Sequence, residues 1–217
     1  MAVDKPADTP VHPLRPDETG TVLNALITNY PQLQGIGEAG LRSAVVHRLD
    51  VLTSGVLLFA KTEKGWSQLR KAFTSRDLLK QYAVIVEGSL EGEDRWVMDL
   101  RIVRHKPAFV VAVPSVGSMV PHKDLRRCDL RYKTLCRSDQ VSLVQIDLGT
   151  GFLHQIRAMM AANGHPVLGD THYGSTIPAP RPMLHAKRIE FDGHIIEAPI
   201  PDDFANAMNT HNLTASP

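Results

Sequence analysis

The sequence has few cysteines, no leader-like amino terminus and no long apolar run, so these features do not indicate a zinc-binding, secreted or membrane protein. Its two cysteines, Cys128 and Cys136, match no common zinc-binding spacing, so we expect reduced thiols. The amino terminus lacks a charged-then-apolar leader pattern, and no apolar run approaches the roughly 20 residues that a membrane span requires. These absences make the cytoplasm the expected location.

A strong excess of charge is also missing. The 217 residues carry a formal net charge of +1, with 43% hydrophobic and 22% charged residues, which is typical of an ordinary globular chain. An anionic partner would therefore have to be bound by local basic clusters. One cluster spans residues 101–106, and a second, residues 122–137, includes Lys123, Arg126 and Arg127. A solvated face is an equally acceptable interpretation of such runs.

The apolar pattern predicts an α+β fold. Helical spacing indicates helices near residues 19–30, 63–78 and 153–163, the first capped by Thr19 or Thr21. Strand-like runs occupy residues 56–60, 80–88, 96–103, 108–113, 128–135 and 141–148. So many strands with few helices predict a mixed, largely antiparallel β-sheet with helices flanking it.

Polar residues beside apolar segments are candidates for chemistry. Arg157 lies on or beside the apolar stripe of the helix at 153–163, and a buried guanidinium needs an anion such as Asp50 or Asp170. Tyr82 shares one face of the strand over residues 80–88 with a lysine and two valines, by the period of two. Taken singly, each has an ordinary alternative: an arginine that snorkels to water, an aspartate in a turn, and a core tyrosine with a wet hydroxyl.

Longer motifs carry a more specific signal. They read "HRLDVLTSGVLLFAKT" from residue 47, "KQYAVIVEG" from residue 80, "GFLHQIRAMMAANGHPVLGDTHYG" from residue 151 and "RPMLHAKRIEF" from residue 181. In this order they resemble the motifs of RNA pseudouridine synthases of the RluA/RsuA type, over about residues 3–200. The resemblance implies the pseudouridine synthase fold with a central active-site cleft. We expect a catalytic domain over residues 1–205 and a polar, disordered tail over residues 206–217.

The resemblance also implies roles for single residues. Asp50 becomes the catalytic aspartate, Tyr82 the active-site tyrosine and Arg157 the arginine that pairs with Asp50. Arg48 would help to displace the target base, and Leu184 would line the uracil pocket. The complete set of positions placed against the substrate is His47, Arg48, His154, Gln155 and Leu184.

The implied reaction isomerises specific uridines to pseudouridine in structured ribosomal or transfer RNA. The sugar leaves N1 of uracil and rejoins at C5, which needs no redox step, so we expect neither a metal nor an organic cofactor. A carboxylate nucleophile on a flipped-out base suffices, whether it attacks the sugar or the base. We expect RNA as partner, no membrane and a monomer without an obligatory protein partner. A catalytically silent RNA-binding or ribosome-assembly factor on the same fold is the alternative.

Two features depart from the family pattern. Val51 and Leu52 follow Asp50 where relatives often carry a basic or polar residue, which bears on the choice of substrate rather than on the chemistry. The chain also begins inside a segment that relatives use as a strand, without the small RNA-binding domain that many carry ahead of the catalytic one. We therefore expect a catalytic core alone or a shortened start.

Overall fold

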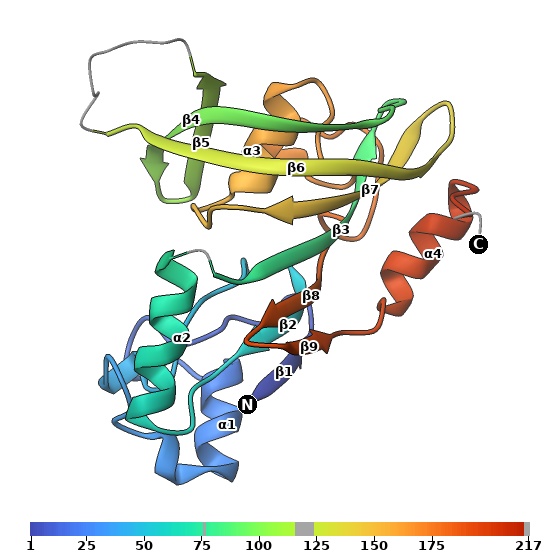
Figure 1. Ribbon diagram of the computed structural model, residues 1–217. Coiled ribbons are helices and arrows are strands. Elements are labelled where there is room, and N and C mark those ends of the chain that lie inside the picture. Colours follow the sequence, from blue (N-terminus) through green and yellow to red (C-terminus); the bar gives the residue numbers. More distant parts are fainter. Residues whose placement is uncertain (76, 116–123, 215–217) are drawn as a thin grey trace. The chain divides into compact units, whose positions relative to one another are not determined.

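The computed structural model describes residues 1–75, 77–115 and 124–214, so Lys123 lies outside the described residues. The chain divides into two compact units (Figure 1). Unit 1 comprises Met1–Lys80 and His185–Ile200, and unit 2 comprises Gln81–Leu184 and Pro201–Pro217. The stretch expected to be one catalytic domain contributes to both units.

Unit 1 combines a small sheet with two helices. Its elements are β1 (Ala2–Lys5), α1 (Val22–Asn29), β2 (Ser54–Leu58), α2 (Glu63–Ser75), β8 (Leu184–Phe191) and β9 (His194–Glu197), with short 3-10 turns at Pro31–Leu33 and Gly40–Arg42. Strand β2 pairs antiparallel with β1 and parallel with β8, and β8 pairs antiparallel with β9. Gly55 permits the close approach of β2 to β8, because a Cβ there would lie 2.2 Å from the carbonyl oxygen of Ala186.

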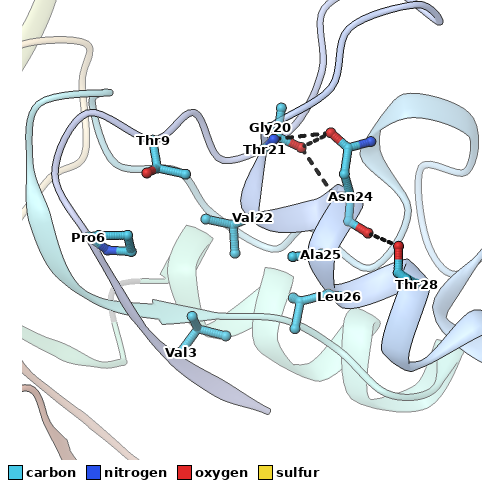
Figure 2. Close-up of a pocket in the computed structure, with 10 residues that line it drawn as sticks. All are labelled: Val3, Pro6, Thr9, Gly20, Thr21, Val22, Asn24, Ala25, Leu26 and Thr28. Carbon is cyan, nitrogen blue, oxygen red and sulfur yellow. Dashed lines mark hydrogen bonds between the residues drawn. The ribbon is translucent and has the colours of Figure 1, made fainter.

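Local signals explain where the helices of unit 1 begin and how they pack. Thr21 caps α1 through a capping box: its hydroxyl accepts the Asn24 N–H, and the Asn24 side chain accepts the Thr21 N–H (Figure 2). The cap predicted at Thr21 is confirmed. On α2, the stripe of Trp66, Leu69 and Phe73 packs against the buried core of unit 1, as the helical spacing predicts.

Unit 2 is built on a five-stranded antiparallel sheet. Its strands are β3 (Leu79–Glu87), β4 (Glu93–His105), β5 (Ala108–Pro114), β6 (Arg126–Arg137) and β7 (Val141–Leu148). They lie in the order β3-β7-β6-β4-β5, and helix α3 (Gln155–Ala162) packs on one face (Figure 1). The core between them contains Leu100, Leu130, Met159 and Met160, all fully buried.

The long strands β4 and β6 extend beyond the apolar runs that predicted them. Alternate residues face the core, as Met98 and Leu100 do on β4, while the pairing continues outward to Glu93 opposite Lys133. Backbone hydrogen bonding continues a ladder where apolar burial has ended, so hydrophobic periodicity alone gives strands that are too short.

The described part of the expected disordered tail, residues 206–214, is partly helical. Helix α4 covers Asp202–Thr210, so residues 206–210 are helical. Phe204 and Leu213 are buried, at 0% and 2% exposure, and Asp203 accepts two hydrogen bonds from the Arg181 guanidinium at 2.6 and 3.0 Å. Phe204 and Asp203 lie just before the expected tail and Leu213 lies within it, so the polar composition of the tail concealed one buried apolar residue.

The predicted fold class is confirmed as α+β with a mixed, largely antiparallel sheet arrangement. The β2–β8 pair supplies the parallel contact. Within the described part of the chain, no helix is long and apolar enough to cross a membrane. The central cleft implied by the resemblance stays a prediction.

Candidate active site

The segment that leads to Asp50 is held by two side chains of α2. The Trp66 indole Nε1 donates to the carbonyl of Val45 at 3.1 Å, and Arg70 Nη1 donates to the carbonyl of Val46 at 3.1 Å. Both bonds reach the main chain, so they fix the path of the backbone without depending on the side chains at residues 45 and 46.

A buried lysine holds the other side of Asp50. Lys5 is 0% exposed, and its ammonium donates to the carbonyls of Pro6 at 2.8 Å, Thr9 at 2.8 Å and Val51 at 2.9 Å. Three donors on one nitrogen match three acceptors, which offsets the cost of burying the charge. Lys5 thereby ties the first strand to the residue after Asp50.

His47 makes contacts inside unit 1. Its Nε2 accepts the Leu58 N–H at 2.9 Å, and its ring stacks on Phe73 with centroids 4.4 Å apart. Burial, and secondarily the charge of Lys80, lowers the pKa of His47 from 6.5 to about 3. The imidazole is therefore neutral and anchors the segment to β2, while the expected contact with substrate stays a prediction.

The residues of the turn itself differ in their exposure. Arg48 is exposed, Leu49 packs against the unit 1 core, and Asp50 is half-buried. The Thr53 N–H donates to the Asp50 carbonyl at 3.0 Å and closes the turn. The apolar pair Val51–Leu52 is 44% and 38% exposed, so these residues present apolar surface next to Asp50.

Arg157 in unit 2 is buried and paired with a carboxylate. On α3 it is 8% exposed, and it donates from Nε to Asp170 Oδ2 at 2.6 Å and from Nη2 to Asp170 Oδ1 at 2.9 Å. Asp170 is 1% exposed. The sequence-based inference that an inward arginine needs an anion is confirmed, with Asp170 as a partner. The predicted pairing with Asp50 stays a prediction.

An aromatic cluster lies against this ion pair. The Arg157 Cζ is 4.9 Å from the centroid of the Tyr173 ring. The Tyr173 hydroxyl accepts the Val110 N–H at 3.0 Å and shares a hydrogen bond with His154 Nδ1 at 2.9 Å. His154 has a left-handed backbone, with φ 49° and ψ 22°, which is uncommon for a residue other than glycine.

The side chain of Gln155, which we expected to contact substrate, forms hydrogen bonds to other residues of unit 2. At 2% exposure, its Oε1 accepts the Thr150 hydroxyl at 2.8 Å and the Phe152 N–H at 3.1 Å, and its Nε2 donates to the Asp129 carbonyl at 2.9 Å. These bonds shape the turn that enters α3. The substrate role predicted for Gln155 stays a prediction.

Tyr82 and Leu184 both pack with the core of unit 2. Tyr82 is half-buried on β3, opposite Ile146 of β7, and Leu184 is 4% exposed. The Leu184 carbonyl accepts a bond from Arg181 Nη1 at 3.1 Å. The structure thus holds both positions firmly, and their assigned roles toward a uracil stay predictions.

The predicted RNA-binding arginines Arg126 and Arg127 are both exposed on β6. Because successive strand residues point to opposite faces of a sheet, they do not form one patch. Arg127 shares its face with Arg131 and Lys133, whereas Arg126 starts the strand on the other face. Sequence proximity alone concealed this separation.

A pocket of about 510 Å³ in unit 1 lies against α1 and the amino-terminal segment (Figure 2). Its ten labelled residues are apolar, hydroxyl-bearing or amide-bearing, so it presents no acid or base that titrates near neutral pH.

Among the residues that the structure describes, no group of three or more His, Cys, Asp or Glu side chains could hold a metal ion.

Two further residues of this architecture were not singled out from the sequence. Lys5 lies two residues after Val3 on β1, and the period of two would have placed both on one strand face. Tyr173 stands three residues after Asp170 in a short segment that ends at Gly174. An aromatic residue three positions after an aspartate is common in proteins, so this spacing alone only weakly indicates a contact with Arg157.

Comparisons with known proteins agree with this architecture. The family model described as RNA pseudouridylate synthase matches residues 1–162. Ribosomal large subunit pseudouridine synthase D of Nitrosomonas europaea is 35% identical, over 94% of this chain and 60% of that protein. The uncharacterized RNA pseudouridine synthase YlyB of Bacillus subtilis is 32% identical, over 96% of this chain and 68% of that protein.

The solved structures show the same fold. Human RNA Pseudouridylate Synthase Domain Containing 4 gives a TM-score of 0.74 at 20% identity, covering 97% of this chain and 89% of that one. Human RNA Pseudouridylate Synthase Domain Containing 1 gives 0.69 at 23% identity, covering 100% and 92%. The chain spans about 60% of the length of the Nitrosomonas relative and 68% of the Bacillus relative.

Proposed function

Because the chain belongs to the RNA pseudouridylate synthase family, we propose that it isomerises uridine to pseudouridine in RNA with Asp50 as the nucleophile. The observation that carries this proposal is the rigid support of the Asp50 turn. Lys5 fixes the carbonyl of the next residue, and His47 binds the turn to β2. A nucleophile held in one place is favoured for covalent catalysis, whereas a passive RNA binder would not require it.

The bond changes follow from the product. The Asp50 carboxylate attacks the sugar or the base, and the bond from the sugar to N1 of uracil breaks. The uracil turns, C5 joins the sugar and loses its proton, and N1 ends protonated. The bond to Asp50 breaks in the same sequence, either when C5 displaces the carboxylate from the sugar or when the base expels it after C5 has joined the sugar, so the free carboxylate is restored. We propose that Tyr82 stacks on the flipped base or accepts the C5 proton, and that Arg157 favours the ionised form of the nucleophile.

We propose structured ribosomal RNA of the large subunit as the first substrate to test. The support is the name of the Nitrosomonas relative, a ribosomal large subunit pseudouridine synthase. The exposed Arg48 would occupy the space that the flipped uridine leaves, and Leu184 would line the uracil pocket. Transfer RNA as substrate, a monomeric state and a cytoplasmic location stay predictions.

The test is Asp50→Asn, which keeps the side chain's shape and removes its charge. The variant should fold and bind an unmodified transcript of large-subunit ribosomal RNA within about tenfold of the parent, or about 1.4 kcal/mol, yet form no pseudouridine. Asp17→Asn is the matched control, since Asp17 is a 77% exposed aspartate of the same unit. The parent should also remain active in excess chelator.

Two outcomes would contradict the proposal. An active Asp50→Asn variant would make Asp50 a structural residue. A parent that binds the transcript and forms no pseudouridine in it, or in total cellular RNA from a strain without the gene, would favour the silent RNA-binding alternative.

A further inference from the structure

We propose that Asp170 and Tyr173 are positioning residues that hold the Arg157 guanidinium in one orientation, and that the reaction depends on this orientation. The inference rests on the proposed function and adds two residues to it. Neither touches the reacting atoms in this proposal, because both act through Arg157.

The contacts on Arg157 restrict it in two directions. Side-on pairing of Nε and Nη2 with both Asp170 oxygens, at 2.6 and 2.9 Å, fixes the plane of the guanidinium and its direction within that plane. The Arg157 Cζ lies over the Tyr173 ring, 4.9 Å from its centroid, so the ring limits movement of the guanidinium toward it. Of its five N–H donors two bind Asp170, and the others are thereby aimed by the same two contacts.

One short turn supplies both contacts. Asp170 and Tyr173 are joined by the 3-10 turn Thr171–Tyr173, and the Asp170 carbonyl accepts the N–H groups of Tyr173 at 2.9 Å and Ser175 at 3.0 Å. Glu87 fixes the end of this 3-10 turn, because its carboxylate accepts the Ser175 hydroxyl at 2.6 Å. The same short, hydrogen-bonded turn therefore carries both the carboxylate and the ring.

The ring has its own supports. Phe109 stacks on Tyr173 with centroids 5.0 Å apart and planes 11° apart. The Tyr173 hydroxyl is bound by the Val110 N–H and by His154, the strained residue that precedes α3. Arg157 lies one turn later on that helix, so the hydroxyl links the helix start to the ring that bounds the arginine.

General stability does not account for this arrangement. Replacing a buried ion pair by apolar residues of similar size is often neutral or stabilising, so such a pair is weak support for a purely structural role. The left-handed backbone of His154 also favours a functional role for this region, because backbone strain tends to persist at functional sites. A requirement to orient Arg157 for the reaction accounts for both the buried ion pair and the left-handed backbone of His154.

The activity test separates chemistry from binding. Asp170→Asn and Tyr173→Leu should lower the single-turnover rate of pseudouridine formation on the large-subunit transcript by about 100-fold, the scale of a small misplacement, with Kd for the transcript within about threefold. Asp129→Asn and Tyr132→Leu are the matched controls and should keep the parental rate. Asp129 also binds an arginine, with Arg95 Nε and Nη2 both donating to its Oδ2, and Tyr132 is 7% exposed against 8% for Tyr173.

A second measurement needs no RNA. In the ¹⁵N-labelled protein, the Arg157 Nε–H signal, assigned by its loss in Arg157→Lys, should exchange slowly with water. It should exchange at least about tenfold faster in Asp170→Asn and Tyr173→Leu, because the hydrogen bond that protects it is weakened.

The outcomes are distinguishable. Slow exchange that survives both substitutions overturns the positioning role, as do single-turnover rates that fall no further than in the controls. A parent inactive on every RNA tested contradicts the proposed function, and faster exchange in both variants would still support the orientation of Arg157 by these residues.

Discussion

The segments that carry two of the predicted catalytic residues, Asp50 and Arg157, are held by different kinds of contact. In unit 1, Lys5, Trp66 and Arg70 all donate to main-chain carbonyls around Asp50. In unit 2, Arg157 is held by the side chains of Asp170 and Tyr173. The first arrangement fixes a path of the backbone, and the second fixes the direction of one functional group.

The contrast between Lys5 and Arg157 matches the chemistry of their charged groups. An ammonium is a compact charge whose three donors can reach separate carbonyls, whereas a guanidinium is a planar fork that suits a carboxylate. We therefore expect substitutions of the two residues to have different effects. Replacing Lys5 should lower the free energy of unfolding, and replacing Arg157 should lower the rate of pseudouridine formation.

The largest expected effect is on the stability of unit 1. Lys5→Met should leave three carbonyls without their donor, at about 1 kcal/mol each, and lower the free energy of unfolding by about 3 kcal/mol. Urea denaturation of the parent and the variant measures it. Lys61→Met, at an exposed lysine of the same unit, is the control. A loss below about 1 kcal/mol would show that the backbone around Asp50 does not depend on Lys5.

Arg157→Lys should show the contrasting loss of activity. A lysine keeps the charge but cannot bind both oxygens of Asp170 side-on, so the single-turnover rate should fall by about 100-fold, or about 2.7 kcal/mol. Arg95→Lys makes the same change at an arginine whose side chain is 60% exposed and should leave the rate unchanged. Equal rates in the two variants would remove the distinction between the units.

A smaller effect should appear in the dependence of stability on pH. The folded pKa of His47, about 3, lies below its ordinary value of 6.5, so below pH 6.5 the unfolded chain binds a proton that the folded chain excludes. Stability from this group is complete above pH 6.5 and falls with decreasing pH, by at most about 1.4 kcal/mol per unit, until pH approaches 3.

His47→Gln should flatten this dependence, because the amide can accept the Leu58 N–H without titrating. Urea unfolding of the parent, the variant and His194→Gln, at an exposed histidine of β9, between pH 7.5 and about 4.5 measures the slopes. Parallel slopes for all three proteins would mean that His47 titrates normally in the folded state.

The smallest expected effect concerns RNA affinity. If the face of β6 that carries Arg127 contacts phosphate, Arg127→Ala should reduce the salt slope of transcript binding by about one, and Arg126→Ala, on the opposite face, should not. Fluorescence titrations at several salt concentrations would show this. Equal slopes for both variants and the parent would return the cluster to the solvated-face interpretation.

Much of the local structure and the inward arginine were predictable from the sequence. Thr21 caps α1, the stripe on α2 faces the core, and Arg157 is buried beside a carboxylate, because each depends on neighbours within a few turns or on a simple rule about buried charge. The tail was predicted less well, because the burial of Leu213 and the helix over residues 206–210 depend on packing that local composition does not reveal.

The sequence by itself determined the α+β class, most elements and membership of the family, since these follow from short-range periodicity and from the order of long motifs. Only the tertiary structure decided that Lys5 reaches a carbonyl 46 residues away, that Asp170 binds Arg157, and that neighbouring arginines on β6 diverge. The physical reason is that a buried polar group must be satisfied by whichever partner folding brings within about 3 Å, and spacing along the chain does not specify that partner.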